Sequence, residues 1–208
     1  MQKRTFENLI FDGKDLFLEG DITIKGSFEM KGAKLIVSGN LTILGGDGVE
    51  IENGDVIVSG DLTIETMINI KGVNIYCDCL YCCDVNLSDS DIWTNTDLSA
   101  SNITSDGNIE VKGNSNVADV TCLNYLITGD NDSESINTSQ DIYILGDNES
   151  CDLTAREILI AGDCDVNDFP ITAHEIVIDG NCDNYCSSIT AHHFVCTGGL
   201  SCGELFIE

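Results

Sequence analysis

A six-residue block recurs along this chain and constrains its fold more than any other feature. The block reads apolar, any, apolar, any, Gly, and then Asp or Asn, as in Leu16–Asp21 and Val56–Asp61. Seven clear copies begin at positions 16, 35, 56, 125, 142, 158 and 176, and four weaker copies begin at 75, 92, 109 and 194, so the spacing stays between 16 and 21 residues. A steady period of this length indicates a repeat architecture in which each repeat packs on its neighbours.

Alternating apolar residues within the block predict a short strand with one buried face. We expect the Gly-Asp or Gly-Asn pair to end this strand, because glycine adopts positive φ easily and Asp or Asn caps a turn. A second apolar position lies five residues before most blocks and six before two of them. Its members are Phe11, Met30, Ile51, Ile70, Leu87, Val120, Leu153, Ile171 and Ile189, with Ile103 and Ile136 at the longer separation.

One such repeat leaves its backbone groups unpaired, whereas stacked repeats pair them above and below and bury one apolar column. The sequence therefore predicts an all-β, single-stranded parallel β-helix (β-solenoid) of about 11 rungs. The expected layout is one domain over residues 1–208, with a cap or first strand over 1–15, rungs over 16–203 and a terminal strand over 204–208. In the last rungs, Ala155, Ala173 and Ala191 should form an inward ladder beside an outward ladder of Thr154, Thr172 and Thr190.

A leucine-rich repeat is the main alternative fold. The segment Ala173–Asn181 has apolar residues and an asparagine at the spacing of that repeat. Leucine-rich repeats, however, run about 20–29 residues and need a convex segment after the strand. The shorter period from residue 75 onward, 16 to 18 residues, favours the β-solenoid.

The rungs Gly20–Ile24 (GDITI) and Gly60–Ile64 (GDLTI) resemble those of the bactofilins. The resemblance covers most of the chain through its pattern. It implies a right-handed parallel β-helix of similar rung length and, as in that cytoskeletal family, self-association into polymers.

Charge and composition restrict the partners and the compartment. The formal net charge is −27, which repels nucleic acids and anionic membranes and favours a basic protein partner or bound cations. The start, Met1–Asn8, lacks the apolar run of a signal peptide, and no stretch has the about 18 apolar residues of a membrane span. Eleven cysteines, an odd number, suit reduced thiols, so we expect a cytoplasmic location.

Four groups of side chains could carry chemistry, and each could instead have only a structural role. Cys77, Cys79, Cys82 and Cys83 could supply a zinc or iron–sulfur site, but Cys77 falls at an inward position and Cys79 stands where the block has its glycine. Cys164 and Cys182 follow the Gly-Asp or Gly-Asn pair one rung apart and could form a disulfide. His174 and His192, with His193 beside them and Arg156 one rung earlier, form a weak two-ligand metal candidate. Asp130, Asp147, Asp163 and Asn181 cap turns or share a calcium ion.

The sequence contains no phosphate-binding loop, nucleophile elbow or zinc-protease motif. We therefore predict a protein that is not an enzyme, with no catalytic, cofactor-binding or metal site. The expected function is a structural or scaffolding solenoid that associates with itself through its rod ends, because the last strand, Glu204–Glu208, has no polar cap after it. An acidic surface that binds a carbohydrate or a basic partner is the second hypothesis, and a polysaccharide-acting enzyme is the third.

Overall fold

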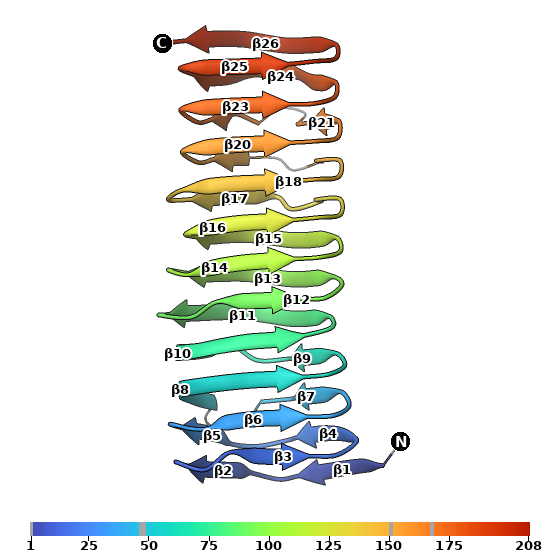
Figure 1. Ribbon diagram of the computed structural model, residues 1–208, viewed down its shortest axis with the longest axis vertical. Coiled ribbons are helices and arrows are strands. Elements are labelled where there is room, and N and C mark those ends of the chain that lie inside the picture. The colour runs from blue at the N-terminus through green and yellow to red at the C-terminus, as the bar shows by residue number, and fades with distance from the viewer. Residues whose placement is uncertain (1, 46–48, 150–151, 167–168) are drawn as a thin grey trace. The chain divides into compact units, whose positions relative to one another are not determined.

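The computed structural model describes residues 2–45, 49–149, 152–166 and 169–208, and its regular structure consists of β-strands, with no helix in those ranges. The chain divides into two compact units, Met1–Asn108 and Ile109–Glu208. Each is a parallel β-solenoid, and the chain has about 11 turns (Figure 1). The fold class predicted from the repeat is confirmed, whereas the single domain over residues 1–208 stays a prediction.

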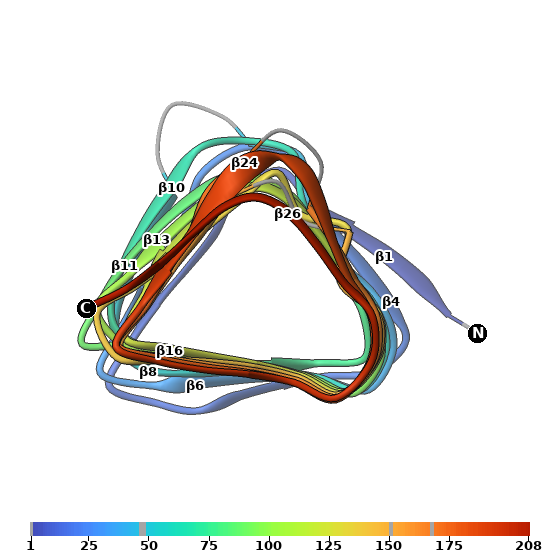
Figure 2. The ribbon, with the colours of Figure 1, turned by 90° about the horizontal axis from the view of Figure 1, so that it is seen from above.

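The first unit consists of short strands that lie on three sides, so that each turn has a triangular outline when viewed along the stack (Figure 2). Longer strands such as β8 and β10 bend around a corner and join two sides. The strands are β1 (Lys3–Phe6), β2 (Leu9–Asp12), β3 (Leu16–Leu18), β4 (Asp21–Ile24), β5 (Phe28–Lys31), β6 (Lys34–Val37), β7 (Leu41–Ile43), β8 (Val49–Val58), β9 (Leu62–Ile64), β10 (Ile68–Cys77), β11 (Leu80–Ser88), β12 (Ile92–Thr94) and β13 (Leu98–Ser105).

The second unit repeats this arrangement with shorter and more regular turns. Its strands are β14 (Asn108–Val111), whose first residue belongs to the first unit, β15 (Ser115–Cys122), β16 (Asn124–Ile127), β17 (Ser135–Thr138), β18 (Asp141–Ile144), β19 (Asp152–Thr154), β20 (Glu157–Ile160), β21 (Cys164–Asp165), β22 (Ile171–Thr172), β23 (Glu175–Ile178), β24 (Cys182–Ala191), β25 (His193–Cys196) and β26 (Leu200–Ile207).

The six-residue blocks lie side by side in parallel and in register within each unit. In the first unit the opening residues Leu16, Leu35, Val56, Ile75 and Ile92 pair from one turn to the next. In the second unit the equivalent ladder is Tyr125, Ile142, Ile158, Ile176 and Phe194. We call the side of each unit formed by these strands its block sheet.

The second apolar position also forms ladders within each unit, but Ile103 does not lie in the column of Leu87. Leu87 pairs with Ser105, while Ile103 pairs with Val85. The prediction that Ile103 lies in the column of Leu87 was therefore wrong. The pairing of β11 with β13 places Ile103 in the column of Val85, two residues before Leu87. The Thr154, Thr172 and Thr190 ladder is confirmed, and Ala173 and Ala191 are buried on the inner side, whereas Ala155 is only partly buried.

The glycine of the block serves a different purpose from the one predicted. Among the block glycines, only Gly20 has a φ in the left-handed region, at 87°. At Gly162 a Cβ atom would instead lie 2.5 Å from the carbonyl oxygen of Gly146 in the preceding turn and would also contact Asp147 Oδ1. Glycine is thus required because successive turns approach too closely for a side chain.

The Asp or Asn that follows this glycine connects the turns by hydrogen bonds. The backbone N–H of Asp147 donates to Asp130 Oδ1 at 3.0 Å, and that of Asp163 donates to Asp147 Oδ1 at 2.8 Å. The N–H of Asn181 donates to Asp163 Oδ1 at 2.7 Å in the same way. The predicted capping role of these side chains is confirmed, and the cap joins one turn to the next rather than closing its own turn.

The interior of each unit is built mainly from Ile, Leu and Val. Four of the nine cysteines that the structure describes are buried among them, namely Cys77, Cys122, Cys164 and Cys182. Each of these interior side chains contacts the equivalent side chains in the turns before and after it, so the column is shielded from water. This burial of apolar surface is the main stabilising contribution in such a stack.

Candidate interaction surfaces

The last turn of the second unit exposes side chains that belong to the interior columns. Leu205 pairs with Ile189 and Ile207 pairs with Ala191, both of which are fully buried one turn earlier. In the last turn, Leu205 is 41% exposed and Ile207 is 56% exposed. Another strand stacked on β26 would cover this apolar surface, so the end of the stack is a candidate docking face.

The first turn of the first unit differs from this open end in charge. Arg4 pairs with Ile22, so a cationic side chain occupies the end of an interior column, and it is exposed. Lys3 lies beside it, and Lys25 forms an ion pair with Glu7 at 3.5 Å. The first turn is therefore mixed in charge, with Lys3, Arg4 and Lys14 beside Glu7, Asp12 and Asp15, whereas the last turn of the second unit contains Glu204 and no lysine or arginine.

Acidic side chains line a groove of about 240 Å³ in the second unit. The lining forms two columns. One contains the turn-capping residues Asp147, Asp163 and Asn181, and the other contains the residues two positions later, Glu149, Asp165 and Asp183. Residues Cys164 and Asp165 pair with Cys182 and Asp183, so the second column is also in register. The groove is lined by Asp147, Asn148, Glu149, Asp163, Cys164, Asp165, Asn181 and Asp183, with no cation among them.

A stripe of apolar side chains follows the outer face of each block sheet, at the second residue of every block. The sequence pattern treated this residue as unconstrained, although ten of its eleven occupants are apolar or aromatic. In the first unit the in-register members are Phe17, Ile36, Ile57, Tyr76 and Trp93, which we call the outer stripe. The second unit has Leu126, Tyr143, Leu159, Val177 and Val195 in the equivalent register.

Aromatic stacking orders one end of the outer stripe. The rings of Tyr76 and Trp93 stack with centroids 4.7 Å apart and an interplanar angle of 2°. Burial, followed by the carboxylates of Asp55 and Asp91, raises the pKa of Tyr76. Each ring covers one face of the other, so less aromatic surface remains for stacking against a sugar, whereas the ring edges and the neighbouring aliphatic groups stay available.

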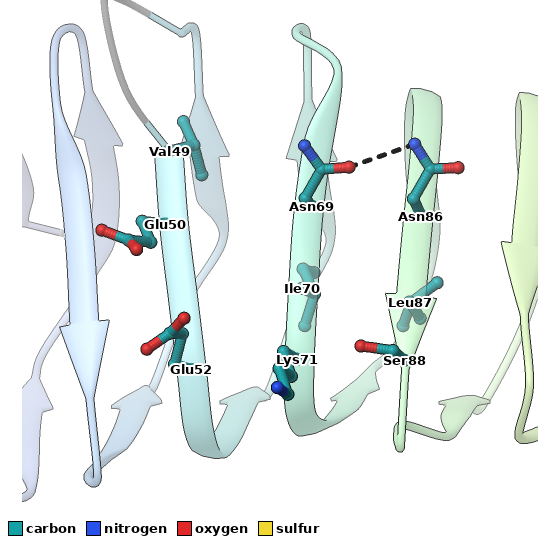
Figure 3. Close-up of a pocket in the computed structure, with 9 residues that line it drawn as sticks. All are labelled: Val49, Glu50, Glu52, Asn69, Ile70, Lys71, Asn86, Leu87 and Ser88. Atoms are coloured by element: carbon teal, nitrogen blue, oxygen red, sulfur yellow. Dashed lines mark hydrogen bonds between the residues drawn. The ribbon is translucent and has the colours of Figure 1, made fainter.

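A hollow of about 450 Å³ lies on another side of the first unit, over β8, β10 and β11 (Figure 3). Asn86 donates to Asn69 Oδ1 at 3.2 Å across its rim. Lys31 forms ion pairs with Glu50 at 3.2 Å and with Glu52 at 4.0 Å. The hydrogen bond to Glu50, strengthened by its charge, raises the pKa of Lys31. These polar groups satisfy one another, so the hollow offers few unpaired groups to a ligand.

The four clustered cysteines do not converge on one point. Cys77 is buried, Cys83 is exposed, and Cys82 lies in register with Ile64. Cys79 does not replace the glycine of its block. Leu80 pairs with Leu62 because this turn is one residue shorter, so Cys79 takes the position of the Asp or Asn. Over the described ranges of the chain, no group of three His, Cys, Asp or Glu side chains could hold a metal ion.

The histidine pair forms as the register predicted. The rings of His174 and His192 stack with centroids 4.6 Å apart, and both side chains are exposed. Arg156 precedes them in the same column, since the His174 N–H donates to its carbonyl oxygen. The Arg156 guanidinium turns away to Asp141, with nitrogen–oxygen distances of 3.0 and 2.8 Å.

A chain of buried hydrogen bonds in the second unit was not predicted. Ser133 donates to Asn131 Oδ1 at 2.8 Å, and Asn131 donates to Asn148 Oδ1 at 2.8 Å. The network reaches the thiol of Cys164, to which Asn148 donates at 3.7 Å. Its members are Tyr125, Ser115, Ser133, Asn131, Asn148 and Cys164.

The stacked pair Cys164 and Cys182 continues this column. A hydrogen bond between the two thiols and burial raise the pKa of Cys164, whereas the same hydrogen bond lowers the pKa of Cys182. The nine cysteines that the structure describes are free thiols. None of the described segments forms a helix that is long and apolar enough to cross a membrane.

No protein-family model, no curated protein and no solved structure matches this chain.

Proposed function

We propose that this chain is a non-catalytic structural or scaffolding solenoid that associates with itself end to end. The observation that carries the proposal is the open last turn of the second unit, where Leu205 and Ile207 expose interior columns. Stacking another turn on β26 would bury these side chains and pair the backbone groups of its free edge.

Charge supports a head-to-tail arrangement of two copies. The first turn is mixed in charge, since Lys3, Arg4 and Lys14 lie among Glu7, Asp12 and Asp15, whereas the last strand carries Glu204 with Glu208 after it and no cation. Contact of the acidic end with the mixed end therefore avoids the repulsion that two acidic ends would have at a formal net charge of −27. Head-to-tail contact also repeats without closing, so it generates filaments rather than dimers.

The finer proposal is a bactofilin-like polymer in a reducing compartment such as the cytoplasm. The GDITI and GDLTI turns and the parallel solenoid support the first part. The free thiols of the described cysteines support the second.

Sedimentation velocity over a concentration series tests end-to-end association of the polypeptide 1–208. We expect the weight-average mass to rise with concentration, and Leu205→Lys to suppress that rise by placing a charged side chain in the apolar contact. Leu145→Lys is the matched control, because Leu145 is 49% exposed but lies on the side of the solenoid. A monomer at every concentration, or equal effects of the two variants, would contradict the proposal.

A second candidate function is recognition of a basic protein by the acidic surface. The observation that favours it is the pair of acidic columns around the 240 Å³ groove. Titration with a lysine homopolymer at low and high salt tests this function, since binding through these columns must weaken with salt. Glu149→Gln combined with Asp165→Asn should lower the affinity, and unchanged affinity would remove the groove from consideration.

A further inference from the structure

We propose that the outer stripe of the first unit binds a basic amphipathic segment of another protein. The apolar side chains of this partner segment would lie against the outer stripe, and the lysines and arginines of the segment would lie against the margins of the stripe. This inference deepens the second candidate function, because it names the partner's chemistry and a contact surface separate from the acidic groove.

The outer stripe is a continuous apolar surface over five successive turns. Phe17 is 59% exposed, and Ile36, Ile57, Tyr76 and Trp93 are each partly exposed. Parallel in-register pairing holds all five in one line, with a spacing of about 4.8 Å between turns. Tyr and Trp, together with Arg, are enriched among the residues that dominate binding energy at interfaces.

Acidic residues flank this stripe on both sides. One margin lies two residues before each stripe position and the other lies two residues after it. The margins contain Asp15, Lys34, Asp55, Asn74 and Asp91 on one side, and Glu19, Ser38, Ser59, Asp78 and Asn95 on the other. The single cation among these ten, Lys34, forms an ion pair with Asp55 at 2.7 Å, so the margins are net acidic.

This charge pattern selects against a second copy of the chain. Two sheets that pack face to face lie about 10 Å apart, and two copies would bring their acidic margins that close. The Debye length at physiological ionic strength is about 8 Å, so part of this repulsion persists. A partner with lysine or arginine beside its apolar residues replaces that repulsion by attraction.

The spacing of the turns also fits a helical partner. One turn of an α-helix rises about 5.4 Å, close to the spacing of about 4.8 Å between solenoid turns. A helix along the stripe would therefore place roughly one apolar residue on each stripe residue. The five turns would accommodate a helix of about 16 residues with one leucine face.

The fluorescence emission of Trp93 reports directly on binding to the outer stripe, since Trp93 is the only tryptophan in the chain and belongs to the stripe. The probe is a peptide of about 16 residues with leucine on one helical face and lysine elsewhere. Two control peptides separate the contributions: one replaces lysine with glutamate, and the other replaces leucine with serine. We expect only the leucine–lysine peptide to shift the Trp93 emission and to saturate.

Two variants of the full chain locate the contact. Ile57→Ser removes the centre of the stripe and should weaken peptide binding at least about tenfold. Ile10→Ser is the matched control, because Ile10 is 62% exposed on a different side of the same unit, and it should change the affinity less than about twofold. The far-ultraviolet circular dichroism of both variants should match that of the parent chain.

Any of the following results would overturn the inference. If Ile57→Ser and the parent chain bind the leucine–lysine peptide with equal affinity, the outer stripe is not the binding surface. If the serine–lysine peptide binds as tightly as the leucine–lysine peptide, recognition depends on charge alone. Equal binding of the leucine–glutamate peptide would remove the role of the acidic margins. A dimer that Ile57→Ser dissociates would make the occupant a second copy. If Glu149→Gln with Asp165→Asn weakens peptide binding while Ile57→Ser does not, recognition of a basic partner stands and this surface is wrong.

Discussion

Gly162→Ala should destabilise the second unit because the new methyl group has no room between two turns. Its Cβ would lie 2.5 Å from the Gly146 carbonyl oxygen and 2.7 Å from the Gly146 carbonyl carbon. These are backbone atoms, so relief requires the two turns to move apart. Insertion of a methyl group into a packed site typically costs about 1–3 kcal/mol.

A second cost comes from the hydrogen bond beside the glycine. The methyl group would also contact Asp147 Oδ1, which accepts the Asp163 N–H at 2.8 Å. Displacing this acceptor removes an interaction worth about 1 kcal/mol at a solvent-exposed site. The total is about 2–4 kcal/mol, which corresponds to a fall in the melting temperature of about 4 to 16 °C for a chain of this size.

Thermal and urea unfolding followed by circular dichroism measure this change, with Gly199→Ala as the control. At Gly199 a Cβ would meet only Asn181 Oδ1 at 3.4 Å, an ordinary contact. That substitution should be neutral, or stabilise slightly by restricting the unfolded chain. A Gly162→Ala variant that melts at the parent temperature would refute the view that inter-turn crowding requires glycine here.

Three further predictions concern the interior. Ile144→Ala, at a fully buried position, should lower the free energy of unfolding by about 2–5 kcal/mol in urea titrations, and a loss under about 1 kcal/mol would contradict a tightly packed column. Tyr125→Phe should cost about 1–2 kcal/mol by removing a hydroxyl from the buried network, and an unchanged midpoint would mean that the network contributes nothing. Burial raises the pKa of Cys122 to about 12, so at pH 8 its thiolate fraction falls about a thousandfold below that of an ordinary thiol. Iodoacetamide followed by mass spectrometry should therefore label exposed Cys83 well before Cys122 in the folded chain, and equal rates would contradict the burial of Cys122.

The linkage of this thiol to stability has a definite sign. The pKa of Cys122 is higher in the folded chain than in the unfolded chain, so folding favours the protonated form. This contribution is fully present below about pH 9 and is lost as the pH rises toward 12. Stability should therefore decline across that alkaline window, in addition to any general effect of the net negative charge.

The fold could be predicted because the period of the repeat shows which segments, distant in the sequence, become neighbouring strands. Alternating apolar residues such as Ile142 and Ile144 indicate a strand, and their recurrence at Ile158 and Ile160 identifies the neighbouring strand. The role of Gly162 could not be found in this way, because glycine satisfies both a positive φ and a close approach. Only the distance to Gly146 distinguishes the two reasons.

The outer stripe was missed for a related reason. The pattern recorded which residues face inward, so Ile57 and Trp93 were treated as free positions although the sequence contained the signal. The misplaced Ile103 has a different origin, since counting residues before a block ignores the lengths of the corners. Its pairing with Val85 depends on how β11 and β13 bend, which a fixed spacing does not encode.

Whether the chain winds upon itself once per period can be measured directly by nuclear magnetic resonance. Nuclear Overhauser contacts between backbone protons should connect Leu159 with Tyr143 in the turn before it and with Val177 in the turn after it, in the pattern of parallel strands. Contacts between residues three or four apart in the chain, or an antiparallel pattern between these segments, would contradict the solenoid.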